Sequence, residues 1–195
     1  MFLNINLIVL AKYIKRSVLF LILSGLKIKE EVLNGNITIA PWNDELLNPN
    51  SYNYRLGDKL FILKDDVIDS RNPSSYEEII IPDDGFLLQP NQLYLGNTYE
   101  VIGSDKYVTQ LIGRSSVGRL GLFLQVTAPI GHCGCRGSWT LELKVVQPLK
   151  VYRNMKIGQV TFWVIDGDTS INYKNGKYNE LSSPKVSEFY KEVLH

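Results

Sequence analysis

The chain has 195 residues and carries 21 Lys and Arg against 20 Asp and Glu, so its formal net charge is +1. A chain of this length can bury one good core and is short for two. A near-balanced charge without a run of Lys or Arg argues against a nucleic-acid surface. The two cysteines, Cys133 and Cys135, are too few and too close together for a disulfide framework, so a cytoplasmic protein is expected.

Residues 1–21 form an apolar extension that Lys12, Lys15 and Arg16 interrupt. No unbroken apolar run approaches the ~20 residues that a membrane helix needs. The charges also lie in the middle of the segment, whereas a signal peptide carries them before its apolar core. We interpret the extension as a packed or oligomer-burying segment. A disordered or non-native extension is the alternative, and a membrane-surface anchor is the least favoured reading.

The remaining chain, residues 22–195, reads as one all-β domain. Ser24 is a candidate N-cap for a short amphipathic helix that stops at Asn34-Gly35. Many short strands separated by turns follow, a pattern typical of a β-sandwich or barrel. Strands are expected at residues 36–40, 52–57, 59–63, 78–81, 86–88, 92–102, 106–112, 149–152 and 159–165. A further helix is expected near residues 187–194, and no internal repeat divides the chain.

Residues 113–119, with the sequence GRSSVGR, form a compact polar loop. Its guanidiniums and hydroxyls, from Arg114, Ser115, Ser116 and Arg119, suit an anion, and its glycines let backbone N–H groups approach a phosphate. Glu142 stands alone in a strand-like pattern and is a candidate proton-transfer group. Together they outline a nucleotide enzyme. The plainer alternatives are surface salt bridges, a serine-shaped turn and a carboxylate that faces solvent.

The tail from about residue 167 is polar and brings Tyr173, Lys174, Lys177 and Tyr178 close together. It can be a loose surface tail. It can also be a lid whose Lys and Tyr side chains close over a bound anion. The aromatic residues among the lysines favour the lid.

These motifs resemble the deoxycytidine triphosphate deaminase branch of the dUTPase-like superfamily. The resemblance covers roughly residues 21–184 and is carried by residues 113–122, by the Gly137-x-x-Thr140-Leu141-Glu142-Leu143 motif and by residues 155–159. The Gly-Arg-Ser-Ser motif also fits plain dUTPases, and Glu142 favours the deaminase branch. The resemblance implies a distorted dUTPase-like β-barrel or jelly roll with a short N-terminal helix. It also implies homotrimers or hexamers with shared active sites.

The chemistry that the resemblance implies is zinc-independent hydrolytic deamination of a cytosine deoxynucleotide, with dCTP giving dUTP and ammonia. The zinc-deaminase pattern of H-x-E with P-C-x-x-C is absent from the sequence. By the resemblance, Glu142 is the proton shuttle, while Ser115 and the backbone of Ala128 hold the attacking water. Arg119 steadies the developing charge and reaches into a neighbouring subunit's site.

By the same resemblance, Arg114, Ser116, Tyr173 and Lys177 bind the triphosphate of a pyrimidine nucleotide. Mg²⁺ bridges the phosphate oxygens, and no protein side chain binds a metal. Thr140 faces the base or the sugar through its backbone.

The sequence departs from the family pattern at three places. His132 stands where the family has an Asp that reads the sugar's 3′-hydroxyl, and a histidine cannot supply a fixed negative charge. Asn53 replaces an Asp, and Leu181 replaces a Gln that contacts the nucleotide. His132, Cys133 and Cys135 also suggest a metal site, but no fourth ligand is evident, so a structural or nucleotide contact is favoured.

The departure at His132 leaves several functions open. The enzyme can read the sugar differently, or it can act on a modified or different nucleotide. A dUTPase-type or bifunctional pyrophosphatase is the alternative enzyme, against which the missing Asp counts. The alternative that is not an enzyme is a catalytically altered regulator that binds nucleotides without turnover.

Overall fold

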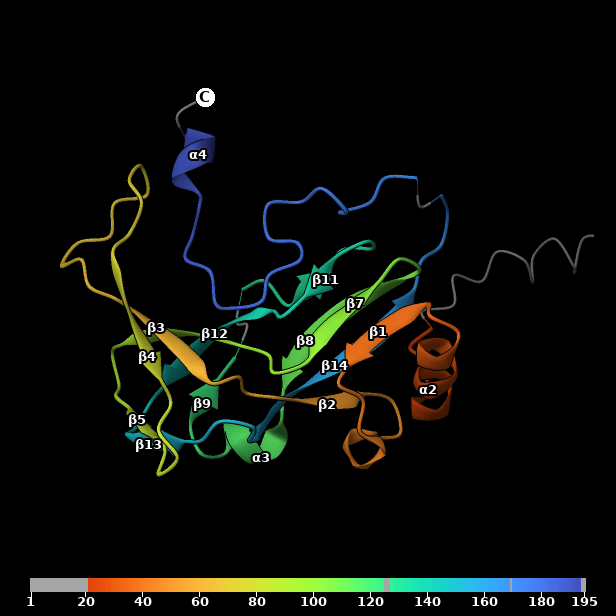
Figure 1. Ribbon diagram of the computed structural model, residues 1–195, viewed down its shortest axis with the longest axis horizontal. Helices are drawn as coiled ribbons and strands as arrows, with labels where there is room; N and C mark the ends of the chain where they lie inside the picture. Colours follow the sequence, from red (N-terminus) through yellow and green to blue (C-terminus); the bar gives the residue numbers. More distant parts are fainter. Residues whose placement is uncertain (1–20, 125–126, 169, 194–195) are drawn as a thin grey trace, which may run out of the picture.

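The computed structural model describes residues 21–124, 127–168 and 170–193 (Figure 1). The extension predicted for residues 1–21 lies outside this part of the chain, apart from Leu21. The described chain is built mainly from short antiparallel strands. Helices α2 (Gly25–Leu33), α3 (Ser115–Gly118) and α4 (Tyr190–Val193) lie at the edges of the strand assembly (Figure 1). The predicted all-β fold is thereby confirmed.

Helix α2 (Gly25–Leu33) opens the described chain, as predicted. Ser24 caps it, since its side chain accepts a hydrogen bond from the backbone N–H of Lys27 at 3.3 Å. The helix ends at Asn34 and Gly35, and Gly35 has a φ of 73°, which a glycine adopts without strain. Ile28 and Glu31 form its buried face, which turns toward strand β1 (Ile37–Ala40).

The strands of the described ranges form four sheets. One contains β1 (Ile37–Ala40), β7 (Val101–Ser104) and β11 (Arg136–Gly137). The second contains β10 (Ile130–Gly131), β8 (Tyr107–Gly113), β14 (Lys156–Val164) and β2 (Tyr52–Arg55). The third contains β4 (Tyr76–Ile80), β3 (Lys59–Leu63), β6 (Leu93–Asn97), β12 (Thr140–Val145) and β9 (Leu122–Phe123). The fourth pairs β13 (Leu149–Val151) with β5 (Phe86–Leu88), and the helical turns are η1 (Asp44–Leu46), α3 (Ser115–Gly118) and α4 (Tyr190–Val193).

Along the strands, buried side chains alternate with less buried ones, and the buried ones form the core. Tyr107, Thr109 and Leu111 of β8 are buried, whereas Val108 and Gln110 between them are only half-buried. Such a pattern of period two points every second side chain inward. The fully buried side chains include Tyr52, Tyr54, Leu60, Leu111 and Phe162, and burying an apolar side chain of this size contributes about 1.5–3 kcal/mol.

The prediction of a single strand at residues 92–102 is wrong, because the structure has two strands there, β6 and β7. Glu100 lies between them and is fully buried. Its carboxylate accepts hydrogen bonds from the Arg55 backbone N–H at 2.8 Å and from Arg55 Nε at 2.6 Å. The Thr98 hydroxyl also donates to the Glu100 carbonyl at 2.7 Å. These contacts turn the chain between the two strands.

Candidate functional site

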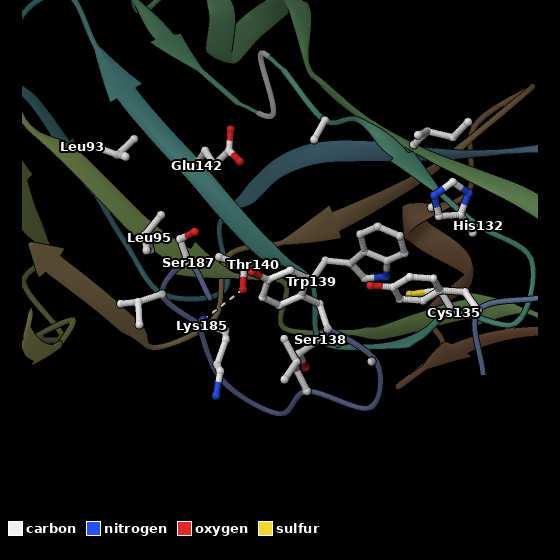
Figure 2. Close-up of a pocket in the computed structure, with 18 of the residues that line it drawn as sticks. Leu93, Leu95, His132, Cys135, Ser138, Trp139, Thr140, Glu142, Lys185 and Ser187 are labelled. Atoms are coloured by element: carbon white, nitrogen blue, oxygen red, sulfur yellow. Dashed lines mark hydrogen bonds between the residues drawn. The ribbon is translucent and has the colours of Figure 1, made fainter. Parts of the chain in front are cut away.

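The described residues enclose a pocket of about 490 Å³ beside strand β12 (Figure 2). Strands β6 and β12 form one wall, and the turn from Gly131 to Trp139 forms another. The tail after residue 170 and the loop between β3 and β4 complete it. Sites for small molecules are commonly of this size, mainly apolar and furnished with a few polar groups.

Strand β12 directs Glu142 into the pocket. Leu141, Leu143 and Val145 point into the core, so Thr140 and Glu142 project from the opposite face. Glu142 is half-buried, and its Oε2 accepts a hydrogen bond from Thr127 Oγ1 at 3.4 Å. Among the described residues that line the pocket, it is the only Asp or Glu. A carboxylate among apolar side chains is positioned to move protons at a bound ligand.

Gly131 allows the turn to pack closely against Trp139 and strand β8. A Cβ atom on Gly131 would lie 1.9 Å from Cη2 of Trp139 and 2.1 Å from Oγ1 of Thr109. Only a residue without a side chain therefore fits beneath the indole ring. Trp139 Nε1 donates a hydrogen bond to the Ile102 carbonyl at 3.0 Å, which orients the indole ring at the pocket wall (Figure 2).

His132 lies at one end of the pocket (Figure 2), and its side chain is exposed. Its ring centroid is 5.5 Å from that of Tyr173, with the rings tilted by 39°. The backbone N–H of Tyr173 donates to the Cys133 carbonyl at 2.8 Å. The turn and the tail thus meet at His132.

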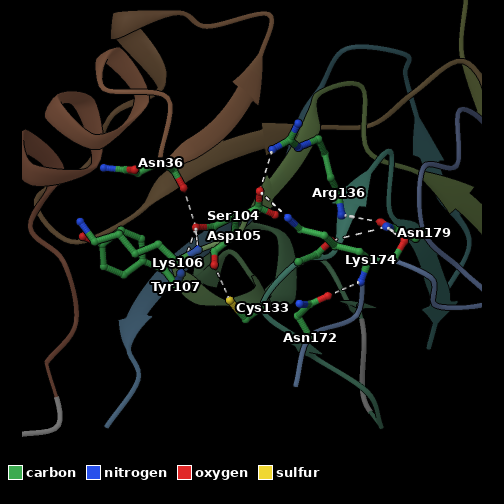
Figure 3. A network of polar contacts seen from close by, with 11 residues as sticks. Asn36, Ser104, Asp105, Lys106, Tyr107, Cys133, Arg136, Asn172, Lys174 and Asn179 are labelled. Atoms are coloured by element: carbon green, nitrogen blue, oxygen red, sulfur yellow. Dashed lines mark hydrogen bonds and ion pairs between the residues drawn. The ribbon is translucent and has the colours of Figure 1, made fainter. Parts of the chain in front are cut away.

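Both cysteines are free and buried. The Cys133 thiol donates to the Asp105 carbonyl at 2.7 Å (Figure 3). Burial raises the pKa of Cys133 and raises the pKa of Cys135 to about 11. A raised pKa opposes the thiolate form in which cysteine binds a metal, which favours the structural reading over a metal site.

Asp105 ties the tail to the turn through a polar network (Figure 3). Its carboxylate lies 3.5 Å from Lys174 Nζ and 3.9 Å from an Arg136 guanidinium nitrogen. The Asn179 side chain accepts a hydrogen bond from the Arg136 backbone N–H at 2.7 Å. These contacts hold residues 172–179 against the 133–136 turn.

The segment predicted to be a lid runs along the pocket. The Ser138 N–H donates to the Leu181 carbonyl at 2.7 Å, and the Lys185 N–H donates to Thr140 Oγ1 at 3.0 Å. Tyr173, Tyr178, Leu181 and Lys185 therefore line the pocket. Lys177 does not, because its ammonium pairs with Glu192 at 2.6 Å.

The predicted phosphate loop forms helix α3 and lies outside the pocket. Arg114 precedes the helix and donates from Nη1 to the Lys156 carbonyl at 3.1 Å. Ser115, Ser116 and Arg119 are exposed. Strand β9, which follows α3, pairs with Lys144 and Val145 beyond Glu142, and Figure 1 places α3 on the opposite side of the molecule from the tail.

The structure of one chain therefore divides the predicted site residues into groups. Ala128, His132, Thr140, Glu142 and Tyr173 surround the pocket. The α3 residues Arg114, Ser115, Ser116 and Arg119 do not line it, and neither does Lys177.

Asn53, where the family has an Asp, is buried away from the pocket lining. Its amide donates to the Leu46 carbonyl and to Asn48 Oδ1, each at 3.2 Å. These bonds hold the turn after η1, so the amide has a structural role that a carboxylate, which has no N–H group, could not fill.

Several pocket residues were not predicted from the sequence. Arg136 and Lys185 bring positive charge to the lining, and Trp139 brings an indole ring. Leu93 and Leu95 also line the pocket, and the alternation of residues 92–97 could have placed them on one face. Nothing local in the sequence signals Lys185, whose position depends on its contact with Thr140.

None of the helices in the described ranges is long and apolar enough to cross a membrane.

An antiparallel β fold whose described pocket residues include one carboxylate beside basic and aromatic groups is suited to binding a small molecule and to proton transfer. A solved structure of 2′-deoxycytidine 5′-triphosphate deaminase from Agrobacterium tumefaciens shares this fold, with a TM-score of 0.60 at 19% identity. The likeness covers 75% of this chain and 48% of that one.

Sequence comparison then specifies the family. A family model described as dCTP deaminase-like matches residues 22–165. A protein of Clostridium acetobutylicum named "dCTP deaminase, dUMP-forming" is 41% identical over 175 residues, which cover 90% of this chain and 100% of the relative. Proteins of the same name from Clostridium botulinum and Cytophaga hutchinsonii are 44% and 45% identical, each covering 88% of this chain and 98% of the relative. The chain belongs to the dCTP deaminase-like family.

Membership of this family confirms the predicted family, the dUTPase-like fold and the prediction of a hydrolase. One expectation is corrected. The family resemblance implied dUTP as the product, whereas the names of the relatives state that they form dUMP.

Proposed function

We propose that this protein converts dCTP to dUMP with release of ammonia and pyrophosphate. The observation that carries the proposal is the half-buried Glu142, the lone carboxylate among the described pocket residues, held on a strand beside Thr140. The names of relatives with 41–45% identity supply the substrate and the product. A pyrimidine nucleoside triphosphate is the ligand that the pocket receives.

The deamination needs a group that moves protons in both directions. A water oxygen bonds to C4 of cytosine, Glu142 takes the water's proton, and the proton passes to N3. A second transfer through Glu142 protonates the amino group, so that the C4–N4 bond breaks and ammonia leaves. Thr127, which donates to Glu142 Oε2 at 3.4 Å, orients the carboxylate. Ala128 lines the pocket close by, where its backbone can hold the water.

The sugar lies toward His132 in this proposal. The imidazole can donate or accept a hydrogen bond with a sugar hydroxyl, and the Tyr173 ring lies beside it. With Glu142 committed to the base, the described pocket residues hold no further carboxylate for this task.

The pocket lining of one chain includes basic side chains from the turn and the tail, but none of the residues of the predicted phosphate loop. We infer that a neighbouring copy supplies Arg119 and Ser115 to the reaction centre, and Arg114 and Ser116 to the triphosphate, in a homotrimer with shared sites. The exposed apolar side chains next to α3 support this arrangement, since Leu120 is 47% exposed, Phe123 47% and Val146 64%. A second copy would remove this apolar surface from water.

The residues present accommodate Mg²⁺ through the nucleotide alone. The pocket lining described here has one carboxylate, and the deamination uses it. Mg²⁺ would therefore bind phosphate oxygens and waters, where it neutralises charge on the triphosphate. A second water cleaves the bond between the α- and β-phosphates and gives dUMP and pyrophosphate.

The direct test is product analysis after incubation of the purified protein with dCTP and Mg²⁺. Equal amounts of dUMP, ammonia and pyrophosphate support the proposal. Pyrophosphate together with dCMP and no ammonia would identify a plain pyrophosphatase. Retained nucleotide binding without any product would identify a regulator.

A further inference from the structure

The pocket continues past Glu142 into an apolar end that the deamination of cytosine does not use. Its lining comes from Leu93 and Leu95 of β6, from Leu63 at the end of β3 and from Ile68 of the β3–β4 loop. Leu93 and Leu95 lie on the side of Glu142 that is away from His132 (Figure 2). The order of the strands, β3-β6-β12, places Leu63 farther along the same sheet.

Strand register places this apolar end directly beside the reacting group. Leu95 is the cross-strand partner of Glu142, and Phe61 is the partner of Leu95 on its other side. Directly opposed residues in an antiparallel sheet have Cβ atoms about 4.5–5.5 Å apart. A ligand atom that contacts Glu142 is therefore within one side-chain length of Leu95.

A ring contact and several hydrogen bonds hold the elements around the apolar end in place. Phe61 stacks on Tyr76 with ring centroids 4.3 Å apart and planes at 19°. The β3–β4 loop is closed at its neck, where the Asp65 carboxylate accepts hydrogen bonds from the Ser75 N–H at 2.9 Å and from its hydroxyl at 2.5 Å. At the tip, the Asp69 carboxylate accepts from the Arg71 N–H at 2.9 Å. These bonds hold the backbone on either side of Ile68.

Apolar surface at this end is available to a ligand. Leu93 is 40% exposed and Ile68 is 51% exposed, although both line the pocket. An apolar substituent that entered here would displace water from these side chains, which is favourable in proportion to the area covered.

The direction of the base follows from the proposed function, on which this inference rests. Glu142 must reach N3 and C4 of the ring, and the sugar on N1 is directed toward His132. C5 is the ring atom next to C4 on the side away from N3. The C4–C5 edge of the base therefore points past Glu142 toward Leu95 and the apolar end.

We propose that 5-alkylcytosine deoxynucleoside triphosphates are further substrates of this site, with 5-methyl-dCTP as the first case. The methyl group occupies the apolar end and is not changed by the reaction. One water adds its oxygen to C4 as the C4–N4 bond breaks, and a second water cleaves the bond between the α- and β-phosphates. The products are 5-methyl-dUMP, ammonia and pyrophosphate.

The experiment compares dCTP and 5-methyl-dCTP as substrates of the full chain with Mg²⁺, with nucleotides separated by chromatography and ammonia measured in parallel. Covering one methyl group is expected to lower KM for 5-methyl-dCTP by up to about fourfold relative to dCTP. We expect 5-methyl-dUMP and ammonia in equal amounts. Turnover of dCTP without any 5-methyl-dUMP would overturn this inference and leave the proposed function standing. Turnover of neither substrate would overturn both.

A pair of variants in one loop locates the methyl group. Ile68→Ser should lower kcat/KM for 5-methyl-dCTP about threefold or more relative to its effect on dCTP. Val67→Ser is the matched control, because Val67 is 82% exposed and does not line the pocket. If Ile68→Ser lowers kcat/KM equally for dCTP and 5-methyl-dCTP, the 5-substituent lies elsewhere and the assignment is overturned.

Discussion

At the scale of single residues, Glu142 combines access to the pocket with partial shielding from water. Leu95 lies opposite it on the neighbouring strand, and Thr127 donates to its carboxylate. A glutamine at this position keeps the size and can still accept that hydrogen bond. It cannot take up and return a proton. Glu142→Gln therefore removes proton transfer while it keeps the packing and the hydrogen bond of the side chain.

We expect Glu142→Gln to lower kcat for ammonia release by about 10²–10⁴-fold, the usual contribution of a positioned acid–base group. Binding of dCTP, measured by calorimetry, should persist. Glu78→Gln on strand β4 is a matched control, since its carboxylate pairs with Lys59 outside the pocket. Full ammonia release by Glu142→Gln would remove Glu142 from the mechanism.

A second residue-scale prediction concerns the buried carboxylate of helix α2. Glu31 contacts Lys27 at 2.9 Å, Lys106 at 3.0 Å and the Asn36 amide at 2.8 Å. Hydrogen bonding to Lys27, reinforced by Lys106 and Asn36, lowers the pKa of Glu31 from 4.5 to about 2. A lowered pKa means that the stabilisation is present above pH 4.5 and is lost as the pH falls toward 2.

Glu31→Gln should therefore lower Tm at pH 7 by about 3–8 °C, because it removes charged hydrogen bonds at a buried position. The difference from the unchanged protein should shrink below pH 4.5 and disappear near pH 2. Glu30→Gln, on the exposed face of the same helix, should have little effect at either pH. A Tm difference that does not depend on pH would contradict the assignment. Thermal unfolding followed by circular dichroism measures the Tm of each variant at each pH.

At the scale of elements, the tail contributes to the pocket without belonging to the sheets. Its contacts with the body include the Ser138–Leu181 and Lys185–Thr140 hydrogen bonds and the Lys174–Asp105 ion pair. Such contacts order a segment locally while the buried strands remain independent of it.

Deletion of residues 170–195 should raise KM for dCTP by about tenfold or more, since Tyr173, Tyr178 and Leu181 leave the pocket lining. Tm should change by only a few degrees, because the strands of the core are untouched. Removal of residues 189–195 alone is the control and should have a smaller effect. An unchanged KM for the longer deletion would show that the tail is not a lid.

The elements also show what the sequence can and cannot predict. Helix α2 and most strands were predictable, because their caps, turns and alternation are local. The division between β6 and β7 was not, since it depends on the buried Glu100 contacting Arg55, which is 45 residues away in the chain. Ala128, His132, Thr140, Glu142 and Tyr173 lie together at one pocket, and the roles assigned to them stay predictions. The path of the tail past Thr140 and the pairing of Lys177 with Glu192 depend on contacts that no local pattern reveals.

At the scale of the whole molecule, the separation of α3 from the pocket is the observation on which the proposed sharing of sites between copies rests. Arg119 projects from a surface that carries exposed Leu120 and Phe123, whereas Glu142 lies in the pocket. If neighbouring copies share sites, one copy supplies the guanidinium and another supplies the carboxylate.

Mixing two inactive variants tests this arrangement. Arg119→Ala and Glu142→Gln chains should each be inactive alone, and unfolding and refolding them together should restore a measurable fraction of activity. Activity can return only at a site where one chain supplies the unaltered Arg119 and another chain supplies the unaltered Glu142. Light scattering should give three times the mass of one chain. Two properly assembled variants that never recover activity would place Arg119 and Glu142 in separate functions.

The placement of Glu142 in the middle of a strand has a consequence for insertions and deletions. Because side chains alternate along β12, loss or gain of one residue before it would shift the register and exchange Glu142 with Leu141 or Leu143, turning the acid into the core. The turn at residues 131–137 has no such constraint on its side chains at His132 and Arg136, which are exposed. New specificity can therefore arise by substitution in the turn, whereas the spacing within β12 tolerates no change in length.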